Sequence, residues 1–220
     1  MIINLNKPIG WTSFDVCKKV KNITKETKVG HGGTLDPFAS GVLIVGTGKD
    51  TKKLKYISDE SKSYDASLFL GEITDTLDVE GKVVQKKAIP TLSERKIKKV
   101  LELLIGDYIQ IPPMYSAKKV AGKKLYEYAR KNIIVKRDPV KLKIFSLSLN
   151  RFDTENISFS VNCSKGTYVR VLGKDIAEKL GTIGYLNILT RTKVGNYTLK
   201  QSQTIENFEK KWKSSIQKKN

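Results

Sequence analysis

Six glycines between residues 30 and 48 constrain what this chain can fold into more than any other feature. They stand at positions 30, 32, 33, 41, 46 and 48. Glycine is unfavourable inside a helix, so the stretch is predicted to form loops around one short buried strand, Val42 to Thr47. Loops on a rigid scaffold often carry functional residues. This stretch is therefore the first candidate for a functional site.

Alternation of apolar and polar residues predicts several strands in the rest of the chain. Tyr64 to Leu70 alternates with period two and ends at Gly71. Val140 to Phe152 and Ile157 to Cys163 are predicted to pair, and the second should bury every other residue. Pro112-Pro113 cannot continue regular structure, so residues 114–123 are predicted to form an exposed, mobile loop before a short helix near Tyr126.

Capping residues and periodic apolar positions predict four longer helices. One follows Thr12-Ser13, one follows Ser93 with a stop at Gly106, one spans Thr167 to Leu180, and one follows Thr204. Their predicted buried faces include these residues: Phe14, Val16, Cys17 and Val20 in the first, Ile97, Val100, Leu101 and Leu104 in the second, and Ile205, Phe208, Trp212 and Ile216 in the last. Without repeats or linkers, the pattern favours one compact α+β domain over residues 1–220.

The charge balance points to a polyanionic partner. Lys and Arg number 41 and Asp and Glu 22, a net charge of +19. Ten basic residues lie between Lys118 and Lys143 against two acidic ones, net +8, and Tyr115, Tyr126 and Tyr128 are interleaved with them. Cations with stacking rings are typical of a nucleic-acid path. The alternative is an ordinary solvated lysine-rich surface.

Other features exclude several classes of protein. Cys17 and Cys163 are the only cysteines, too few for a disulfide framework or for a metal site with the usual Cys and His ligands. The longest apolar run is Val42 to Val45, and the amino terminus has no secretory apolar region. The sequence therefore predicts a cytoplasmic protein without a metal site.

The segment Gly30-His31-Gly32-Gly33-Thr34-Leu35-Asp36-Pro37-Phe38-Ala39-Ser40-Gly41 carries the candidate chemistry. A surface turn is one reading of it. A phosphate-binding loop at residues 46–49 is rejected, because Leu43 stands where that pattern needs Gly and Asp50 where it needs Ser or Thr. Asp36 precedes a proline and is biased toward extended backbone, and the neighbouring glycines allow a substrate to approach its carboxylate closely.

The segment 30–41 closely resembles the catalytic motif of the TruB-type tRNA pseudouridine-55 synthases, in which the Asp before Pro is the essential carboxylate. Further segments are similar to other motifs of the family and occur in family order from residue 4 to about residue 197. They are Lys7 to Ser13, the opening motif; Lys62-Ser63-Tyr64, the strand with the active-site tyrosine; 111–118 through 122–130, the RNA-gripping insertion; and Cys163 to Arg170, the arginine motif.

The resemblance implies a pseudouridine synthase fold, a mixed and mainly antiparallel sheet flanked by helices. It implies a cofactor-free isomerisation of uridine 55 in the T-arm loop of tRNA, with Asp36 as the catalytic carboxylate. Tyr64 would stack on the flipped base and assist proton removal, and Arg170 would pair with Asp36. From the residues alone, Tyr64 could equally be half-buried packing and Arg170 a surface cation.

Substrate binding is predicted for a further set of residues through the same resemblance. Leu189 would form the apolar wall beneath the base, although core packing explains it equally well. His31, which could instead be structural, would contact the RNA near the flipped nucleotide. The full predicted set is His31, Gly33, Thr34, Lys118, Lys123, Lys124, Tyr126 and Leu189.

Two other functions remain open from the sequence. One is an RNA-folding chaperone or binding module, for which the carboxylate of Asp36 should be dispensable. The other is the related guide-RNA-dependent synthase, disfavoured because its extra RNA-anchoring domain is not expected here. The chain ends about 15 residues after Thr204, so it is predicted to lack a complete extra C-terminal RNA-binding domain. A monomer without an obligate protein partner is expected.

Overall fold

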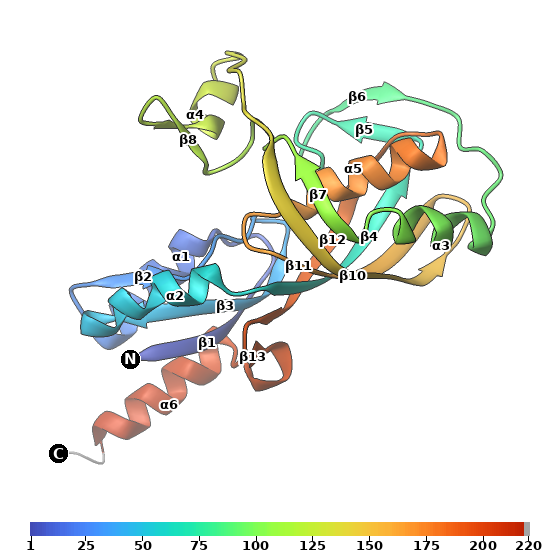
Figure 1. Ribbon diagram of the computed structural model, residues 1–220. Coiled ribbons are helices and arrows are strands. Elements are labelled where there is room, and N and C mark those ends of the chain that lie inside the picture. The colour runs from blue at the N-terminus through green and yellow to red at the C-terminus, as the bar shows by residue number, and fades with distance from the viewer. Residues whose placement is uncertain (218–220) are drawn as a thin grey trace. The chain divides into compact units, whose positions relative to one another are not determined.

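The computed structural model describes residues 1–217 and divides the chain into two compact units (Figure 1). Unit 1 comprises Met1–Tyr64 and the chain from Leu189 onward, and unit 2 comprises Asp65–Ile188. The boundaries fall inside two strands, β4 (Lys62–Leu70) and β12 (Gly184–Val194), so each of these strands runs from one unit into the other. Each unit is described separately below.

Unit 1 is built on strand β3 (Ser40–Thr47), the predicted buried strand, which begins two residues earlier than expected. Strand β1 (Ile2–Lys7) pairs antiparallel with β3 from Ile2–Gly46 to Lys7–Gly41, and β2 (Val29–His31) pairs antiparallel with its end. β12 is parallel to β3 at two positions, and β13 (Tyr197–Thr198) pairs with β12. The other elements of the unit are α1 (Ser13–Thr24), η1 (Gly48–Lys53), α2 (Leu54–Asp59), η2 (Leu199–Gln201) and α6 (Ile205–Gln217).

Both faces of β3 are buried, which explains its continuous apolar run. Leu43 and Val45 pack in a cluster with residues of β1, α1 and α6. Val42 and Ile44 alternate to the other face, as a strand requires, and pack in a second cluster that includes Leu54. α1 begins where predicted, because Thr12 caps it and forms a capping box with Asp15.

Unit 2 contains a row of neighbouring strands. In space, β4 lies between β12 and β11 (Asn156–Cys163), and the row continues with β10 (Val140–Phe152) and β7 (Gly106–Gln110). β10 pairs antiparallel with both β11 and β7. Two helices accompany these strands, α3 (Glu94–Glu102) and α5 (Val169–Leu180). Smaller elements are the hairpin β5 (Glu72–Thr74) with β6 (Val83–Lys86), and β8 (Lys119–Val120), β9 (Lys123–Lys124) and α4 (Leu125–Ala129) in the insertion.

The predicted fold class and the pairing of the 140–152 and 157–163 strands are confirmed. Several details were wrong. Phe14 is 72% exposed and Ile216 is 46% exposed, so neither belongs to a buried face. α3 ends at Glu102, and Gly106 opens strand β7 instead of stopping the helix. α5 begins at Val169, two residues after the predicted start.

The predicted loop after Pro112-Pro113 is more structured than expected. It contains the β8–β9 hairpin, and Pro112, Pro113 and Ser116 are buried. Strands β1, β7 and β12 were not predicted at all. Within residues 1–217, no helix has both the length and the apolar character needed to span a membrane.

Candidate active site

Asp36 lies in the loop that joins β2 to β3 in unit 1. Its neighbours Leu35 and Phe38 are 4% and 5% exposed, whereas Asp36 itself is only half-buried. The backbone N–H of Ala39 donates to the carbonyl of Asp36 at 3.1 Å, which closes a turn over Pro37. The apolar flanks therefore anchor the loop in the core, and Asp36 between them is less buried than either.

Arg191 of β12 holds the loop by donating hydrogen bonds to backbone carbonyls. Its guanidinium is buried, and its Nε donates to the carbonyl of Val42 at 2.7 Å. Its Nη1 and Nη2 donate to the carbonyls of Thr34 and Gly33, each at 3.1 Å. A buried charge needs such partners, and the rigid fork of an arginine fixes the three carbonyls in one geometry.

A close backbone approach places Arg191 there. Gly41 has φ +107° and pairs with Arg191 in the parallel β3–β12 register. A Cβ at position 41 would lie 2.2 Å from the carbonyl oxygen of Arg191, which no structure tolerates. Only glycine combines this left-handed backbone with this approach. The last glycine of the 30–41 segment is thus explained by packing against β12.

Lys7, fully buried at the end of β1, holds the other side of the loop. Its ammonium donates to the carbonyls of Pro8, Trp11 and Pro37 at 2.8, 2.6 and 3.3 Å. Three acceptors match the three donors of an ammonium group. The lysine thereby connects the residue after Asp36 to the segment that enters α1.

The start of α1 is also bonded to both sides of Asp36. The hydroxyl of Ser13 accepts from the N–H of Leu35 at 2.9 Å and donates to its carbonyl at 3.2 Å. The N–H of Gly10 donates to the carbonyl of Pro37 at 2.8 Å. Backbone groups on each side of the carboxylate therefore have fixed partners, as buried polar groups require.

The other predicted residues of unit 1 are placed as follows. His31 ends β2 and is half-buried, and Thr34 is exposed. Gly33 has φ +126°, and its carbonyl, like that of Thr34, accepts from Arg191. Tyr64 on β4 is 9% exposed and Leu189 on β12 is 5% exposed. Leu189 and Arg191 are two apart on one strand, so their side chains share a face.

Arg170 belongs to unit 2 as the second residue of α5, and it is 3% exposed. Its guanidinium donates to the carbonyls of Thr76 and Tyr115 at 2.6 and 2.8 Å, and Nη1 lies 3.2 Å from Oδ2 of Asp78. Within its own unit, then, the arginine has a carboxylate partner that the sequence did not indicate. The pairing of Arg170 with Asp36 concerns residues of different units and stays a prediction.

Gln110 fixes the backbone from which Arg170 projects. Tyr168 caps α5 without a side-chain bond to the helix. The Gln110 side chain bonds the Tyr168 backbone twice instead, accepting from its N–H at 2.9 Å and donating to its carbonyl at 3.1 Å. Gln110 also donates to the hydroxyl of Tyr108 at 3.2 Å. A buried side chain of β7 therefore fixes the backbone of the residue that precedes α5.

The network continues from Tyr108 to α5. The Tyr108 hydroxyl donates to the carboxylate of Asp175. Burial raises the pKa of Asp175 despite this bond, and burial followed by the bond to Asp175 raises the pKa of Tyr108. Desolvation disfavours both charged forms. The neutral tyrosine thus remains a donor and couples β7 to the middle of the helix.

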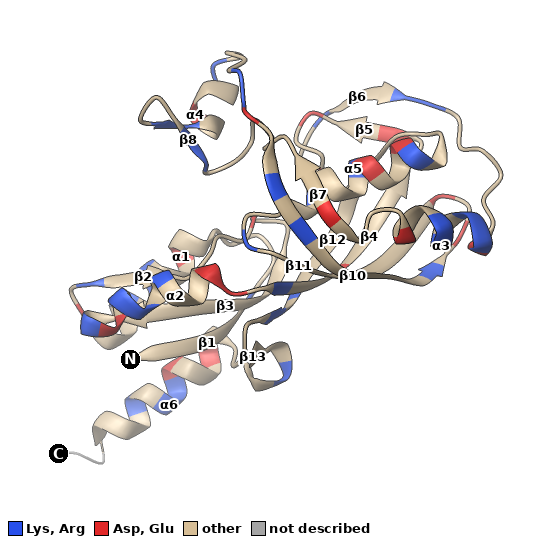
Figure 2. Ribbon diagram, in the orientation of Figure 1, with Lys and Arg blue, Asp and Glu red and all other residues tan. Residues whose placement is uncertain are grey.

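The insertion carries the predicted RNA-binding lysines on small elements (Figure 2). Lys119 pairs with Lys124 and Val120 with Lys123 in the β8–β9 hairpin, whose turn residues Ala121 and Gly122 both have positive φ. Two residues with positive φ are typical of a type I′ turn. Lys123 is exposed, and Lys118 and Lys124 are half-buried.

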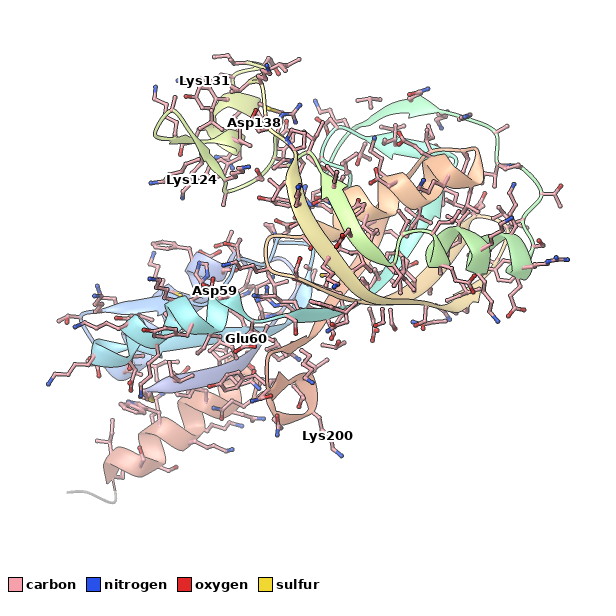
Figure 3. All side chains as sticks on the ribbon, in the orientation of Figure 1. Asp59, Glu60, Lys124, Lys131, Asp138 and Lys200 are labelled. Atoms are coloured by element: carbon pink, nitrogen blue, oxygen red, sulfur yellow. The ribbon has the colours of Figure 1, made fainter. Side chains whose placement is uncertain are left out.

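Tyr126 organises part of this basic cluster. The Nζ of Lys124 lies 5.4 Å from the ring centroid of Tyr126, and the Cζ of Arg130 lies 5.3 Å from it. Both distances are within the range of cation–π attraction. Figure 3 shows the side chains of Lys124 and Lys131, which come from this segment. Tyr126 therefore holds two cations in place, a role that sequence reasoning had not assigned to it.

Sequence reasoning missed the residues that support the site. Lys7 and Ser13 lie inside the quoted opening motif without an assigned role, and Arg191, Gln110 and Asp78 were not singled out. The signal for Arg191 was its position two residues after Leu189 on an alternating segment. Within residues 1–217, no group of three or more His, Cys, Asp or Glu side chains could hold a metal ion.

Comparisons with known proteins agree with the arrangement. Residues 21–169 match the family described as "TruB family pseudouridylate synthase (N terminal domain)". The chain is 44% identical over 217 residues to tRNA pseudouridine synthase B of Caldanaerobacter subterraneus subsp. tengcongensis, covering 98% of this chain and 76% of that protein. It is 46% identical over 207 residues to the protein of the same name from Clostridium acetobutylicum, covering 94% and 71%.

Solved structures show the same fold. A chain in the crystal structure of a Cbf5-Nop10-Gar1 complex matches with a TM-score of 0.75 and 28% identity over 95% of this chain and 53% of that one. A chain of an H/ACA RNP bound to a substrate RNA containing 2′-deoxyuridine matches with a TM-score of 0.72 and 26% identity over 97% and 55%. This chain thus spans about half the length of those two. By sequence and by fold, it belongs to the TruB family of pseudouridylate synthases.

Proposed function

We propose that this protein is a tRNA pseudouridine synthase that isomerises the uridine at position 55, in the T-arm loop, to pseudouridine. The observation that carries the proposal is Asp36, a half-exposed carboxylate on a loop whose backbone groups are bonded on both sides. A carboxylate held in this way is preorganised for a reaction at a substrate brought to it. Relatives of 44% and 46% identity are named tRNA pseudouridine synthase B.

The reaction rearranges one nucleotide without change of redox state. The bond between N1 of uracil and C1′ of ribose breaks, and a bond between C5 and C1′ forms. The proton leaves C5 and a proton is gained at N1, so the product is an isomer and no cofactor is consumed. Asp36 attacks the sugar or the base, or abstracts a sugar proton; a carboxylate can act as the nucleophile or as the base in these routes.

The remaining predicted residues serve this step in the proposal. Uridine 55 must leave its loop and enter a pocket, which costs a few kcal/mol. Tyr64 stacks on the flipped base and helps to remove the C5 proton, with Leu189 as an apolar wall. Arg170 stabilises the ionised Asp36, since a neighbouring guanidinium favours a carboxylate.

Binding of the RNA falls to two further groups of residues. His31, Gly33 and Thr34 lie in or beside the loop of Asp36 and contact the nucleotides near the target. The cationic insertion, with Lys118, Lys123, Lys124 and Tyr126, grips the T arm. Phosphate contacts of this kind position an RNA without reading its sequence. The protein acts in the cytoplasm as a monomer and needs no protein partner for catalysis.

The test is to map pseudouridine in an unmodified tRNA transcript after incubation with the purified protein. We expect one new pseudouridine, at position 55, and none in a matched transcript in which that uridine is replaced by cytidine. The chaperone alternative predicts tRNA binding or refolding without any pseudouridine. Absence of product from a protein that binds the transcript would therefore reject the proposal.

A further inference from the structure

The start of α1 and the segment that precedes it expose apolar side chains beside the loop of Asp36. Phe14 is 72% exposed, Trp11 is 36% exposed and Ile9 is 68% exposed. Elsewhere on α1, the apolar residues Val16, Cys17 and Val20 are buried. Exposed rings grouped on one surface are a signal of binding, whereas single exposed apolar residues are ordinary.

Lysines continue the same face of the helix. Residues 14, 18, 21 and 25 recur at helical spacing, so Phe14, Lys18 and Lys21 point to one side, and both lysines are exposed. A hollow of about 410 Å³ lies against Trp11 and Lys18, and one of about 490 Å³ against Phe14, Lys18 and Lys21. We call the set Trp11, Phe14, Lys18 and Lys21 the α1 stripe.

We propose that the α1 stripe binds the unpaired nucleotides that flank the target uridine, with Phe14 stacking on a base and the two lysines contacting phosphates. An aromatic platform followed by cations is the arrangement used for single-stranded nucleic acid. Asp15 lies beside the stripe and is negatively charged, with its carboxylate accepting the N–H and the hydroxyl of Thr12 in the capping box. The two lysines outnumber it, so this face keeps a positive balance.

The position of the stripe supports nucleotides as its occupant. Ser13, between Trp11 and Phe14 in sequence, bonds Leu35, and Gly10 bonds Pro37, so the stripe adjoins the residues on each side of Asp36. An RNA whose flipped base reaches Asp36 must place its neighbouring nucleotides near this surface. The inference rests on the proposed function and adds a second RNA contact, within unit 1, to that of the insertion.

Equilibrium binding of a T-arm stem-loop RNA to proteins carrying Asp36→Asn tests the inference without turnover. Phe14→Leu should weaken binding at least about fivefold, and Phe14→Tyr should not, since only the ring stacks. One flanking nucleotide should stack on Phe14. An abasic substitution at that nucleotide should abolish the difference in RNA affinity between Phe14→Leu and the parent protein, which carries Asp36→Asn alone. Because Phe14 is largely exposed, neither variant should alter the melting temperature.

The lysines are tested through the salt dependence of the same binding. Lys18→Gln with Lys21→Gln should lower the slope of log binding constant against log salt by about 1.4, the value for two phosphate contacts to a single strand. The matched control is Lys210→Gln with Lys211→Gln on α6, which removes the same charge from exposed positions of the same unit and should leave the slope unchanged.

Two results would overturn the inference. One is unchanged RNA affinity in Phe14→Leu. The other is loss of a wild-type self-association in Phe14→Leu while RNA affinity stays constant, which would assign the stripe to a second copy of the chain. Neither result contradicts the proposed function. That proposal fails only if the protein with Asp36 intact forms no pseudouridine.

Discussion

The loop of Asp36 and the insertion of residues 111–132 are both connections between strands, but buried side chains bond the first at more points than the second. The Asp36 loop is bonded by two buried cations, Lys7 and Arg191, and by Ser13. The insertion contains two-residue strands and a five-residue helix. The buried Arg170 donates to its residue Tyr115 at 2.8 Å, and its local backbone bonds include Leu125 to Lys118 at 2.9 Å and Tyr126 to Ser116 at 3.1 Å.

In the proposed function, the two regions have different tasks. A reacting carboxylate must be held in one geometry, because small displacements reduce the rate steeply. A surface that grips phosphates can adapt, because long lysine side chains find their partners by electrostatic attraction. We expect substitutions under the Asp36 loop to affect stability and rate, and substitutions in the insertion to affect affinity and its salt dependence.

The largest effect is expected for Arg191→Met. The substitution leaves the carbonyls of Gly33, Thr34 and Val42 without their charged donor, so the free energy of unfolding should fall by about 3 to 5 kcal/mol. The single-turnover rate should also fall, because the loop loses its support. Urea denaturation and quenched-flow assays measure the two effects.

Arg151→Met is the matched control, because Arg151 is exposed on β10. Its stability should change by no more than about 0.5 kcal/mol. Equal effects of the two substitutions would remove the basis for calling the Asp36 loop the more firmly held region.

A smaller loss of stability is expected for Gln110→Leu in unit 2. The N–H of Tyr168 loses its acceptor, while its carbonyl still accepts from Val171 and Leu172, so the free energy of unfolding should fall by about 1 to 3 kcal/mol. Arg170 follows Tyr168 by two residues, so the rate at saturating tRNA should fall while binding is retained. Gln110→Glu keeps an acceptor for the N–H and should be intermediate. A destabilised variant with a normal rate would limit Gln110 to a structural role.

Substitutions in the insertion should change only the affinity for tRNA and its salt dependence. Neutralising Lys118, Lys119, Lys123 and Lys124 together should lower the slope of log binding constant against log salt by up to about 3. The single-turnover rate of the saturated complex should change little. Neutralising Arg95, Lys96, Lys98 and Lys99 on α3 removes the same charge and should leave the slope unchanged. A collapsed rate with normal binding would place the insertion in the catalytic step instead.

The smallest effect is expected at the surface of the unit that carries Asp36. Glu209 of α6 contacts Lys19 of α1 and Lys213, each at 2.8 Å, and these hydrogen bonds lower its pKa to about 2. A carboxyl with a lowered pKa stabilises the fold above its ordinary value of 4.5, and the contribution is lost as the pH falls toward 2.

Glu209→Gln should therefore destabilise the protein slightly at pH 7, and the difference from wild type should shrink as the pH falls from 4.5 toward 2. Melting temperatures across this range measure it. The rate of product formation should not change, because the buried bonds to Lys7, Ser13 and Arg191 hold the loop. A rate loss comparable to that of Arg191→Met would show that the surface bridge matters as much as the buried cations.

The sequence predicted those parts of the fold that depend on local patterns. Thr12 begins α1, Gly181 ends α5 in a left-handed conformation, and the alternation of Ile157, Phe159, Val161 and Cys163 buries one face of β11. Ile216 fitted the same helical periodicity, yet it is exposed. Periodicity marks an apolar face without showing whether the neighbouring element reaches as far as that turn.

The supports of the site could not be predicted in the same way. Lys7 and Arg191 are charged, and charged residues are expected at the surface unless partners are known. Their partners are backbone carbonyls in the Asp36 loop and in the segments next to it, and backbone carbonyls carry no side-chain signature. Likewise, Gln110 bonds the backbone of Tyr168, 58 residues away in the sequence. Asp36 itself is singled out by the continuous motif that surrounds it, and its catalytic role stays a prediction.

The central claim is that Asp36 performs the chemistry while other residues hold the RNA, and Asp36→Asn tests it most directly. The amide keeps nearly the same shape but loses the anionic oxygen. Pseudouridine formation at position 55 under single-turnover conditions with saturating tRNA should be undetectable, while the dissociation constant for tRNA stays within about threefold of wild type, a change of less than 1 kcal/mol. Wild-type-like product formation by Asp36→Asn would contradict the account.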